Sequence, residues 1–498
     1  MNKKLYQYLF FFIVLIAIYS IIGVGKYLHY TPAGLHHWAQ SDRASIAYTY
    51  YQYNNSFFLP MTFNYNNGNG ITGVEFPIIY YSVAQLYKIF GFNDFIFRFF
   101  TLALTIISFF YFIELIKLFN KNFWLILLGI IILYTSPIFI YYSFSFLPDI
   151  YALNLFIIAL YYFEKYRRTD TTIYLVLYAV LICLSILIKI TFAIYLIALL
   201  TSFTLIRKHK FITKEKILLL VLSCISLIVC YSWYSYSKNL NVKYNSGVFL
   251  MDFKPSENFF KYIDNMLRGF KTWFTDFINS ATLLLISTIF IYLIINIKKL
   301  NKFYTAFFII STFGVIIFTY LFSFQYIDHD YYYIQFYSLI IIVYLIFVDF
   351  SNQYYMPSNA LSKSIVIALF ICSIIFLKFN ISDRFNKDSR YNNYSSYTNT
   401  INLIGIDKEL DKLNIPLSAK FVVFDDPSMN ISLYYMKRFG VQMSYLNDKG
   451  TIDWYMSKSD IDYVLINNNN LVENTLINHW LGALVLKNDH YSVYKKNR

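Results

Sequence analysis

Long apolar runs alternate with short polar breaks along the first 380 residues of the chain. An apolar run of about 20 residues is long enough for a helix that crosses a bilayer, and Leu5–Gly25 is one such run. The pattern predicts about eleven membrane-spanning helices. Their expected ranges are Leu5–Leu28, Phe95–Leu118, Phe123–Tyr141, Ile150–Phe163, Thr172–Ile188, Ile190–Ile206, Ile217–Tyr236, Phe277–Ile297, Phe303–Phe324, Ile334–Val348 and Ile365–Phe379.

The apolar stretch Thr172–Ile206 is too long for one ordinary span. Basic segments flank it on both sides, at Lys165–Arg168 and Arg207–Lys216. A charge at the middle of the bilayer costs about 2.5–3.5 kcal/mol on the insertion scale, so Lys189 is more stable at a turn. We therefore predict a helical hairpin with Lys189 at its outer turn.

The positions of lysine and arginine set the expected orientation of the spans. Breaks rich in Lys and Arg stay on the cytoplasmic side, and with a turn at Lys189 all of these breaks fall on one side. The N-terminus is then cytoplasmic, and its apolar run is read as an uncleaved first span. The expected outer segments are His29–Asp94, Tyr141–Asp149, the Lys189 turn, Lys238–Asp276, Phe324–Tyr333 and the C-terminal tail.

The tail is polar and rich in Asn, Asp and Lys. Residues 420–426 are expected to form a buried strand, and residues 427–440 a helix closed by Gly440. Residues 463–470 and 483–495 predict further strands, the second range forming a hairpin around Asn488 and Asp489. The tail contains no glycine-rich phosphate loop and no cysteine, so its sequence does not mark it as catalytic.

The predicted fold is therefore an all-α polytopic membrane protein with a small α/β domain outside the membrane. Residues 1–380 form the membrane domain and include the outer loop 29–94, while residues 381–498 form the extracytoplasmic domain. Composition agrees, because 58% of the 498 residues are hydrophobic and only 14% are charged, against roughly a quarter in soluble domains. The net charge of +14 comes from the breaks between spans, which excludes a nucleic-acid-binding surface as its cause.

Unusual polar residues collect in the first outer loop. Asp42 and Arg43 lie in the stretch GLHHWAQSDRA, and Glu75 lies in VEFPIIYY. Two amphipathic helices, His36–Tyr53 and Pro77–Phe90, are expected at the membrane surface. The adjacent His36 and His37 would point in different directions on a helix, which disfavours a metal site there.

Further polar residues lie at three other outer turns. Asp149 follows Pro148 at the start of a span, where it could equally cap the helix. Lys189 could also simply extend its amine to the interface, and His329 and Asp330, beside Tyr332, could belong to an ordinary exposed turn. Together these groups suit glycosyl transfer from a polyprenyl-phosphate sugar. A carboxylate can act as base on the acceptor, and cations can stabilise the departing phosphate.

The order of these segments resembles the C-type membrane glycosyltransferases, especially the protein O-mannosyltransferase and lipid A aminoarabinose transferase group. The resemblance covers residues 1 to about 380. The segments that carry it are WAQSD (Trp38–Asp42), VEFPIIYY (Val74–Tyr81), LPDIYAL (Leu147–Leu153), IKIT (Ile188–Thr191) and HDYYYI (His329–Ile334).

The resemblance implies a role for each of these positions. Asp42 would be the catalytic carboxylate, and Glu75 the acidic residue of the E-x-P motif. Lys189 and His329 would face the donor phosphate, with Arg43 as a helper. Aminoarabinose transferases usually carry Lys after the motif's acid, whereas this chain has Phe76, which puts aminoarabinose as the sugar in doubt. The remaining candidate site residues are Asp149, Asp330 and Tyr332.

The expected enzyme is an inverting glycosyltransferase of the bacterial inner membrane, acting on a lipid, glycan or protein acceptor. No cofactor is certain; a divalent metal is an option, and Glu75 and His329 are the residues that could hold one. A lipid or glycan flippase or transporter is the alternative from another class, although transporters tend to place charges at mid-membrane. An O-antigen polymerase or ligase is a third reading, but the Lys238–Asp276 loop has only one arginine, Arg268.

Overall fold

The structure is a computed structural model, which describes residues 3–65, 69–206, 214–249, 254–353, 360–386, 398–443 and 449–497. The basic segment Arg207–Lys216 therefore lies largely outside the described residues, as does part of the first loop. The chain divides into two compact units. Unit 1 contains residues Met1–Leu28, Phe99–Trp233 and Asp252–Ser382, and unit 2 contains His29–Arg98, Tyr234–Met251 and Asp383–Arg498.

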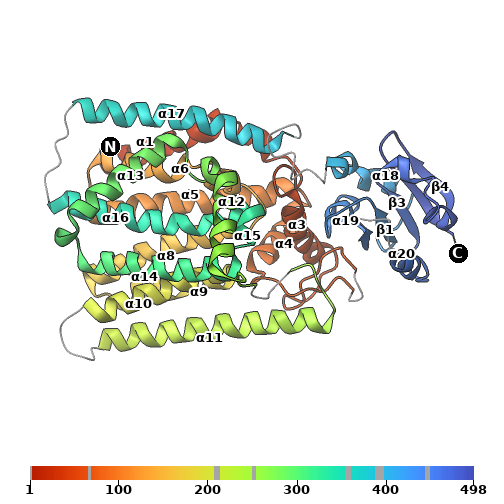
Figure 1. The fold of residues 1–498 in the computed structure, drawn as a ribbon, viewed down its shortest axis with the longest axis horizontal. Coiled ribbons are helices and arrows are strands. Elements are labelled where there is room, and N and C mark those ends of the chain that lie inside the picture. The colour runs from red at the N-terminus through yellow and green to blue at the C-terminus, as the bar shows by residue number, and fades with distance from the viewer. Residues whose placement is uncertain are drawn as a thin grey trace. The chain divides into compact units, whose positions relative to one another are not determined.

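Unit 1 is a bundle of helices, and Figure 1 shows α5, α8, α14 and α16 as long, roughly parallel ribbons. Helix α8 packs along α9, and α14 packs along both α10 and α16. The bundle's longer helices are α1 (Lys3–Ile21), α5 (Asp94–Phe119), α6 (Phe123–Tyr134), α8 (Asp149–Thr169), α9 (Thr172–Ile188), α10 (Ala193–Ile206), α11 (Lys214–Lys243), α12 (Phe259–Phe277), α13 (Ser280–Ile295), α14 (Lys302–Phe322), α16 (Phe336–Gln353) and α17 (Ala360–Phe385). Short turns of helix complete it: α2 (Val24–Tyr27), α7 (Pro137–Tyr142), η1 (Ile190–Phe192), η2 (Ile297–Lys299), α15 (Gln325–Asp328) and η3 (Asp330–Gln335).

Each apolar run that predicted a span is helical over most of its length, but two of the predicted spans are broken. The run Phe123–Tyr141 divides into α6 and α7, and the run Leu5–Leu28 divides into α1 and α2. Within the described residues, five helices are long and apolar enough to cross a membrane, and the bent pair α12–α13 brings the total to six. Four further apolar helices are shorter, at 10–17 residues. The mostly helical class is confirmed, while the number of about eleven spans stays a prediction.

The predicted break at Lys189 is confirmed. Helix α9 ends at Ile188, and Lys189 itself is extended, with φ −146° and ψ 108°. One turn of η1 follows before α10 begins at Ala193. This backbone break places the lysine between two apolar helices rather than inside one.

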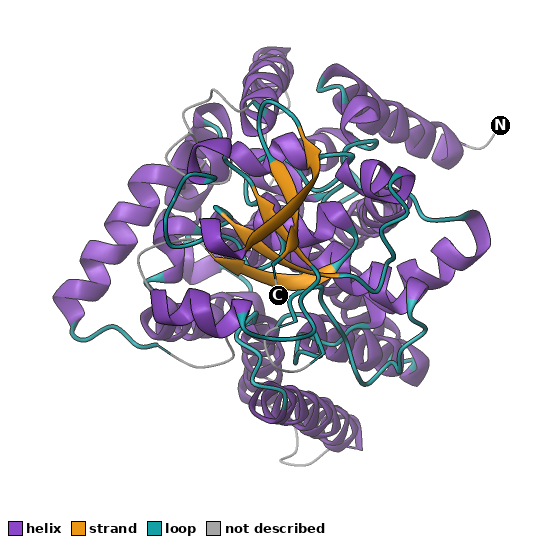
Figure 2. Cartoon of the chain, turned by 90° about the vertical axis from the view of Figure 1, so that its right-hand side faces the viewer, coloured by secondary structure: helices purple, strands orange, loops and turns teal. Residues whose placement is uncertain are grey.

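Unit 2 combines the first loop with the C-terminal sheet. Its loop helices are α3 (His37–Gln52) and α4 (Ile78–Phe90), as the sequence predicts to within a residue or so. The sheet has five strands in the order β2-β1-β3-β5-β4 and is the orange element in Figure 2. The remaining elements are η5 (Thr398–Leu403), α18 (Ile406–Lys412), β1 (Lys420–Phe424), α19 (Ile431–Met436), β2 (Phe439–Met443), α20 (Lys449–Met456), β3 (Tyr463–Ile466), η6 (Asn469–Leu471), η7 (Asn478–Trp480), β4 (Leu481–Lys487) and β5 (Ser492–Lys496).

Strand β1 lies at the centre of the parallel part of the sheet. It pairs in parallel with β2 on one side and with β3 on the other. Strand β5 pairs antiparallel with both β3 and β4, so the predicted C-terminal hairpin is confirmed. Apolar side chains of β1, β2 and β3 meet those of α20 in one core, among them Val422, Val441, Val464 and Ile452.

The predicted role of Gly440 is wrong. Helix α19 ends at Met436, and Lys437 adopts the left-handed conformation that closes it, with φ 55°. Gly440 lies instead inside β2, where an added Cβ would sit 2.2 Å from the Phe421 carbonyl oxygen. The glycine is needed for close backbone approach between two strands rather than for a helix end.

Candidate active site

Helix α3 positions Asp42 and Arg43. No Gly or Pro interrupts His37–Gln52, so the segment can form a continuous helix. His36 precedes it in the left-handed conformation, with φ 54°, and the Leu35 amide donates to the Arg384 carbonyl over 2.9 Å. Asp42 is 2% exposed. The polar cluster noted in the sequence is thus largely buried rather than spread on a surface.

Glu75 is held by a loop fixed to the end of α11. The Gly73 amide donates to Asn241 Oδ1 over 2.6 Å, and Ser237 Oγ donates to the Val74 carbonyl over 2.9 Å. Space is so tight that an added Cβ on Gly73 would lie 1.8 Å from the Ser237 carbonyl oxygen. These contacts fix the two residues directly before Glu75.

Asp42, Arg43 and Glu75 form one ionic cluster. Arg43 Nη1 lies 4.0 Å from Asp42 Oδ2, and Arg43 Nε donates to Glu75 Oε1 over 3.3 Å. The Tyr80 hydroxyl donates to the same Glu75 oxygen. The guanidinium also lies over the Phe249 ring, 4.6 Å from its centroid. Arg43 therefore bridges the two carboxylates while Glu75 and Phe249 fix its plane.

The second oxygen of Asp42 is available. Within the described residues, Asp42 Oδ1 is buried and has no hydrogen-bond partner. Burial raises the pKa of Asp42 to about 7; Arg43 opposes this shift, whereas the carboxylates of Glu75 and Asp426 add to it. A carboxylate with a pKa near neutral is suited to accept a proton.

The C-terminal segment supports α3 within unit 2. Asn430, before α19, donates through Nδ2 to the Ser41 carbonyl over 3.3 Å. Asp426 is buried and accepts from the Ser428 and Ser432 amides over 2.8 and 3.0 Å, while burial raises its pKa. Sequence reasoning missed this support, and the only signal was the pair of aspartates directly after strand β1.

The other predicted residues gather in unit 1. Lys189 Nζ lies 2.6 Å from Asp149 Oδ1, and its amine is 4.5 Å from the centroid of the Tyr332 ring. The His329 ring packs against the same tyrosine, with centroids 6.0 Å apart. Asp149 is the first residue of α8, so its carboxylate favours the helix N-terminus and also neutralises the lysine.

Asp330 is engaged differently from its neighbours. Its side chain is fully buried and accepts a hydrogen bond of 2.5 Å from the Tyr142 hydroxyl. This bond ties η3 to α7, which also contact one another along their length. Asp330 therefore holds the turn that carries His329 and Tyr332. Unit 1 thus unites Asp149, Lys189, His329 and Tyr332, and unit 2 unites Asp42, Arg43 and Glu75.

The donor set does not fit a bound metal. Among the described residues, no three His, Cys, Asp or Glu side chains group closely enough to hold a metal ion. Glu75 already accepts from a guanidinium and a phenol, and a cation there would face the Arg43 charge. We derive no metal-dependent step from this arrangement.

One family of known proteins matches part of this sequence. Residues 75–236 match the family described as dolichyl-phosphate-mannose-protein mannosyltransferase. That range begins at Glu75 and includes Asp149 and Lys189. Among curated proteins, none matches the sequence.

Solved structures match the fold over nearly the whole chain. ArnT from Cupriavidus metallidurans, a lipid A aminoarabinose transferase, matches in its apo state with a TM-score of 0.64 at 10% identity, over 97% of both chains. The same protein bound to undecaprenyl phosphate matches with a TM-score of 0.60 at 10% identity, over 97% of this chain and 98% of that one.

An archaeal enzyme shares the fold more distantly. The oligosaccharyltransferase of Archaeoglobus fulgidus in its apo form has a TM-score of 0.56 at 11% identity, over 97% of this chain and 73% of that one. At such identities, the structural matches define the fold alone. Together with the match over residues 75–236, they bear out the resemblance and the enzyme class predicted from the sequence, that of the C-type membrane glycosyltransferases.

Proposed function

We propose that this protein transfers a sugar from a polyprenyl-phosphate donor to a hydroxyl or amine of an acceptor, with Asp42 as the base. The observation that carries the proposal is the buried Asp42 carboxylate, which has one free oxygen and a pKa of about 7. The undecaprenyl phosphate in one ArnT structure and the dolichol-phosphate in an archaeal one support the donor class.

The reaction would be an inverting displacement. The acceptor oxygen or nitrogen attacks the anomeric carbon of the sugar while Asp42 Oδ1 takes its proton. The bond between the anomeric carbon and the phosphate oxygen breaks, and polyprenyl phosphate leaves with the bonding electrons. Arg43 keeps Asp42 ionised enough to act as base, since a cation nearby lowers a carboxylate's pKa. Glu75 and Tyr80 hold Arg43 in place.

Lys189 would bind the donor phosphate, assisted by His329 and Tyr332. Its ammonium is a point charge that suits phosphate oxygens, and Asp149 balances that charge when no donor is bound. A departing phosphate gains negative charge in the transition state, which a fixed cation stabilises. Loss of Lys189 is therefore expected to weaken donor binding and slow the transfer step.

The enzyme would act at the outer face of a bacterial inner membrane. About eleven spans, a cytoplasmic N-terminus and an outer C-terminal domain of residues 381–498 are the proposed topology. The apolar helices support a multi-pass membrane protein, and the positive residues between spans support the orientation. The acceptor is a lipid, glycan or protein exposed on that face.

A transfer assay with matched variants tests the proposal. Membranes with wild-type protein, Asp42→Asn or the exposed control Asp489→Asn are incubated with radiolabelled polyprenyl-phosphate sugars and a crude envelope acceptor. Transfer by wild type and the control, with a loss of at least about 100-fold in Asp42→Asn, is the expected result. Undiminished transfer by equally abundant Asp42→Asn would remove Asp42 as the base, and no transfer from any donor would contradict the proposed reaction.

A further inference from the structure

Helix α12 has a direction unlike the other long helices of unit 1. It bends by 104° relative to α13, which begins three residues after α12 ends. Figure 1 shows it running across α14 and α16 rather than along them. If the bundle crosses the membrane, a helix at nearly a right angle to it lies close to the membrane plane.

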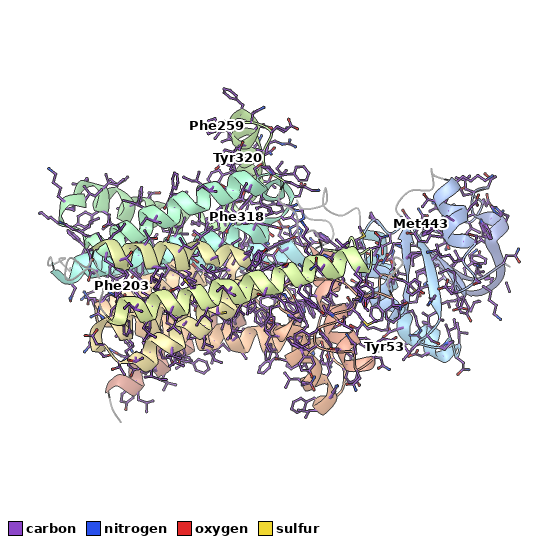
Figure 3. All side chains as sticks on the ribbon, turned by 90° about the horizontal axis from the view of Figure 1, so that it is seen from below. Tyr53, Phe203, Phe259, Phe318, Tyr320 and Met443 are labelled. Atoms are coloured by element: carbon purple, nitrogen blue, oxygen red, sulfur yellow. The ribbon has the colours of Figure 1, made fainter. Side chains whose placement is uncertain are left out.

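One face of α12 is fixed to unit 1. Trp273 Nε1 donates to the Ile327 carbonyl over 2.9 Å, and Asn265 Nδ2 donates to Ser323 Oγ over 2.9 Å. An added Cβ on Gly269 would lie 2.3 Å from the Tyr326 carbonyl oxygen. Figure 3 labels Tyr320 on α14, beside which α12 runs. The rotation of α12 about its own axis is therefore set by close, specific contacts.

A second face is apolar and uncovered. Phe260 is 83% exposed and Leu267 is 63% exposed, and both lie on the same side of the helix as Ile263. Phe259, labelled in Figure 3, and Phe270 continue the face and are also exposed. Five large exposed apolar side chains on about three turns of one helix exceed what a water-facing surface usually carries.

The third face is basic. It contains Lys261, Arg268 and Lys271, together with Asp264. These residues project from the remaining side of the helix, between the packed face and the apolar face. Lys261 Nζ is 3.7 Å from Asp264 Oδ2. In the described part of the chain, Arg268 and Lys271 have no ion-pair partner. Three cations and one carboxylate leave this face with two net positive charges.

We propose that α12 is an interfacial anchor whose apolar face enters the lipid and whose basic face binds anionic headgroups. An amphipathic helix in the membrane plane needs both faces, one for the acyl boundary and one for the headgroups. Basic residues near an anionic surface each strengthen binding about fivefold. The partner that this surface binds is the bilayer itself. Because the packed face fixes α12 to the rest of unit 1, the anchor also sets the depth of unit 1 in the bilayer.

Spin labels on the full-length protein test the depth of α12. Cys224 and Cys372, the two exposed cysteines, are replaced by serine, and one cysteine is introduced as Phe260→Cys or Arg268→Cys. In lipid nanodiscs, the Phe260→Cys label is expected to collide mainly with oxygen, as an Ile371→Cys label on α17 does. The Arg268→Cys label is expected to be accessible to a water-soluble nickel chelate.

Two results would overturn the anchor. One is a Phe260→Cys label as open to the nickel chelate as a label at Lys408→Cys, a solvent-exposed position of α18. The other is spin–spin broadening at Phe260→Cys, which would place a second copy of the chain against the apolar face.

The lipid preference is tested by charge removal. Lys261, Arg268 and Lys271 are changed together to glutamine, and the control variant changes Lys408, Lys487 and Lys495 to glutamine. The association of spin-labelled phosphatidylglycerol, relative to phosphatidylcholine, is expected to fall severalfold in the first variant and to stay unchanged in the second. Equal preference in wild type and the first variant would overturn the headgroup assignment.

Discussion

The ionic cluster of unit 2 predicts that two variants shift the pH profile of transfer in opposite directions. Asp42 must be ionised to accept a proton, so kcat/KM should rise with pH and reach half its maximum near pH 7. Arg43 lowers the pKa of Asp42, whereas Glu75 raises it. We expect Arg43→Gln to move the midpoint to higher pH and Glu75→Gln to move it to lower pH.

The size of the shift follows from the geometry. Arg43 Nη1 and Asp42 Oδ2 are 4.0 Å apart, and two unit charges at that distance interact by about 4 kcal/mol at an effective dielectric constant of 20. That energy corresponds to about three pKa units as an upper limit. Because Arg43 also interacts with Glu75, an upward shift of about one to two units is expected for Arg43→Gln. Glu75→Gln removes a carboxylate that raises the pKa of Asp42, and it also lets Arg43 interact more strongly with Asp42. Both effects lower the midpoint.

The assay is transfer from a radiolabelled polyprenyl-phosphate sugar, measured at low donor concentration between pH 5 and 9. Lys88→Gln is the control for losing a positive charge, and Glu409→Gln for losing a negative one; both residues lie outside the cluster. Each control should keep the wild-type midpoint. If Arg43→Gln and Glu75→Gln shift the midpoint in the same direction, or not at all, Asp42 is not the titrating base.

Three further predictions concern other parts of the chain. Lys189→Gln should raise KM for the donor about tenfold or more, and Lys189→Arg should restore part of the lost donor affinity. An unchanged KM would show that Lys189 does not bind the donor phosphate. Gly440→Ala should lower the melting temperature by several degrees, because its Cβ would meet the Phe421 carbonyl oxygen at 2.2 Å; an unaltered melting curve would contradict the close packing of β1 and β2. Burial lowers the pKa of Lys437 to about 8, so above pH 8 the unfolded chain binds more protons and the wild type should gain stability up to about pH 10.5. Lys437→Met should lack that gain in melting curves recorded at pH 7.5 and 10, and a parallel gain in both proteins would show that Lys437 does not titrate as its burial requires.

Much of the fold could be predicted from the sequence because apolar patterning dominates this chain. Helix α4 follows from its amphipathic pattern and from Pro77 and Gly91 at its ends. Helix α3 lies where the sequence predicts it, but it is buried on nearly every side rather than amphipathic. Helix α12 was missed inside an expected loop. Its residues alternate among three environments, and only contacts with distant segments, such as that of Gly269 with Tyr326, reveal which face is buried.

The candidate site was predictable in its residue types and less so in its partners. Asp42 and Glu75 stand out as carboxylates in a polar loop, but sequence alone does not say that Arg43 bridges them. Asp426 and Asn430 lie nearly 400 residues from Asp42 in the chain. Their influence on α3 depends on tertiary packing, which no local pattern encodes.

The support of α3 by Asn430 has a consequence for how such enzymes can diversify. The C-terminal sheet and the first loop belong to one compact unit, so the tail is not an independent module that recombination can exchange. A chimaera that keeps residues 1–380 and takes a foreign tail would inherit the base without the residues packed against its helix. New acceptor preferences would then have to arise through substitutions made jointly in both segments, which ties the evolutionary rate of the tail to that of the loop.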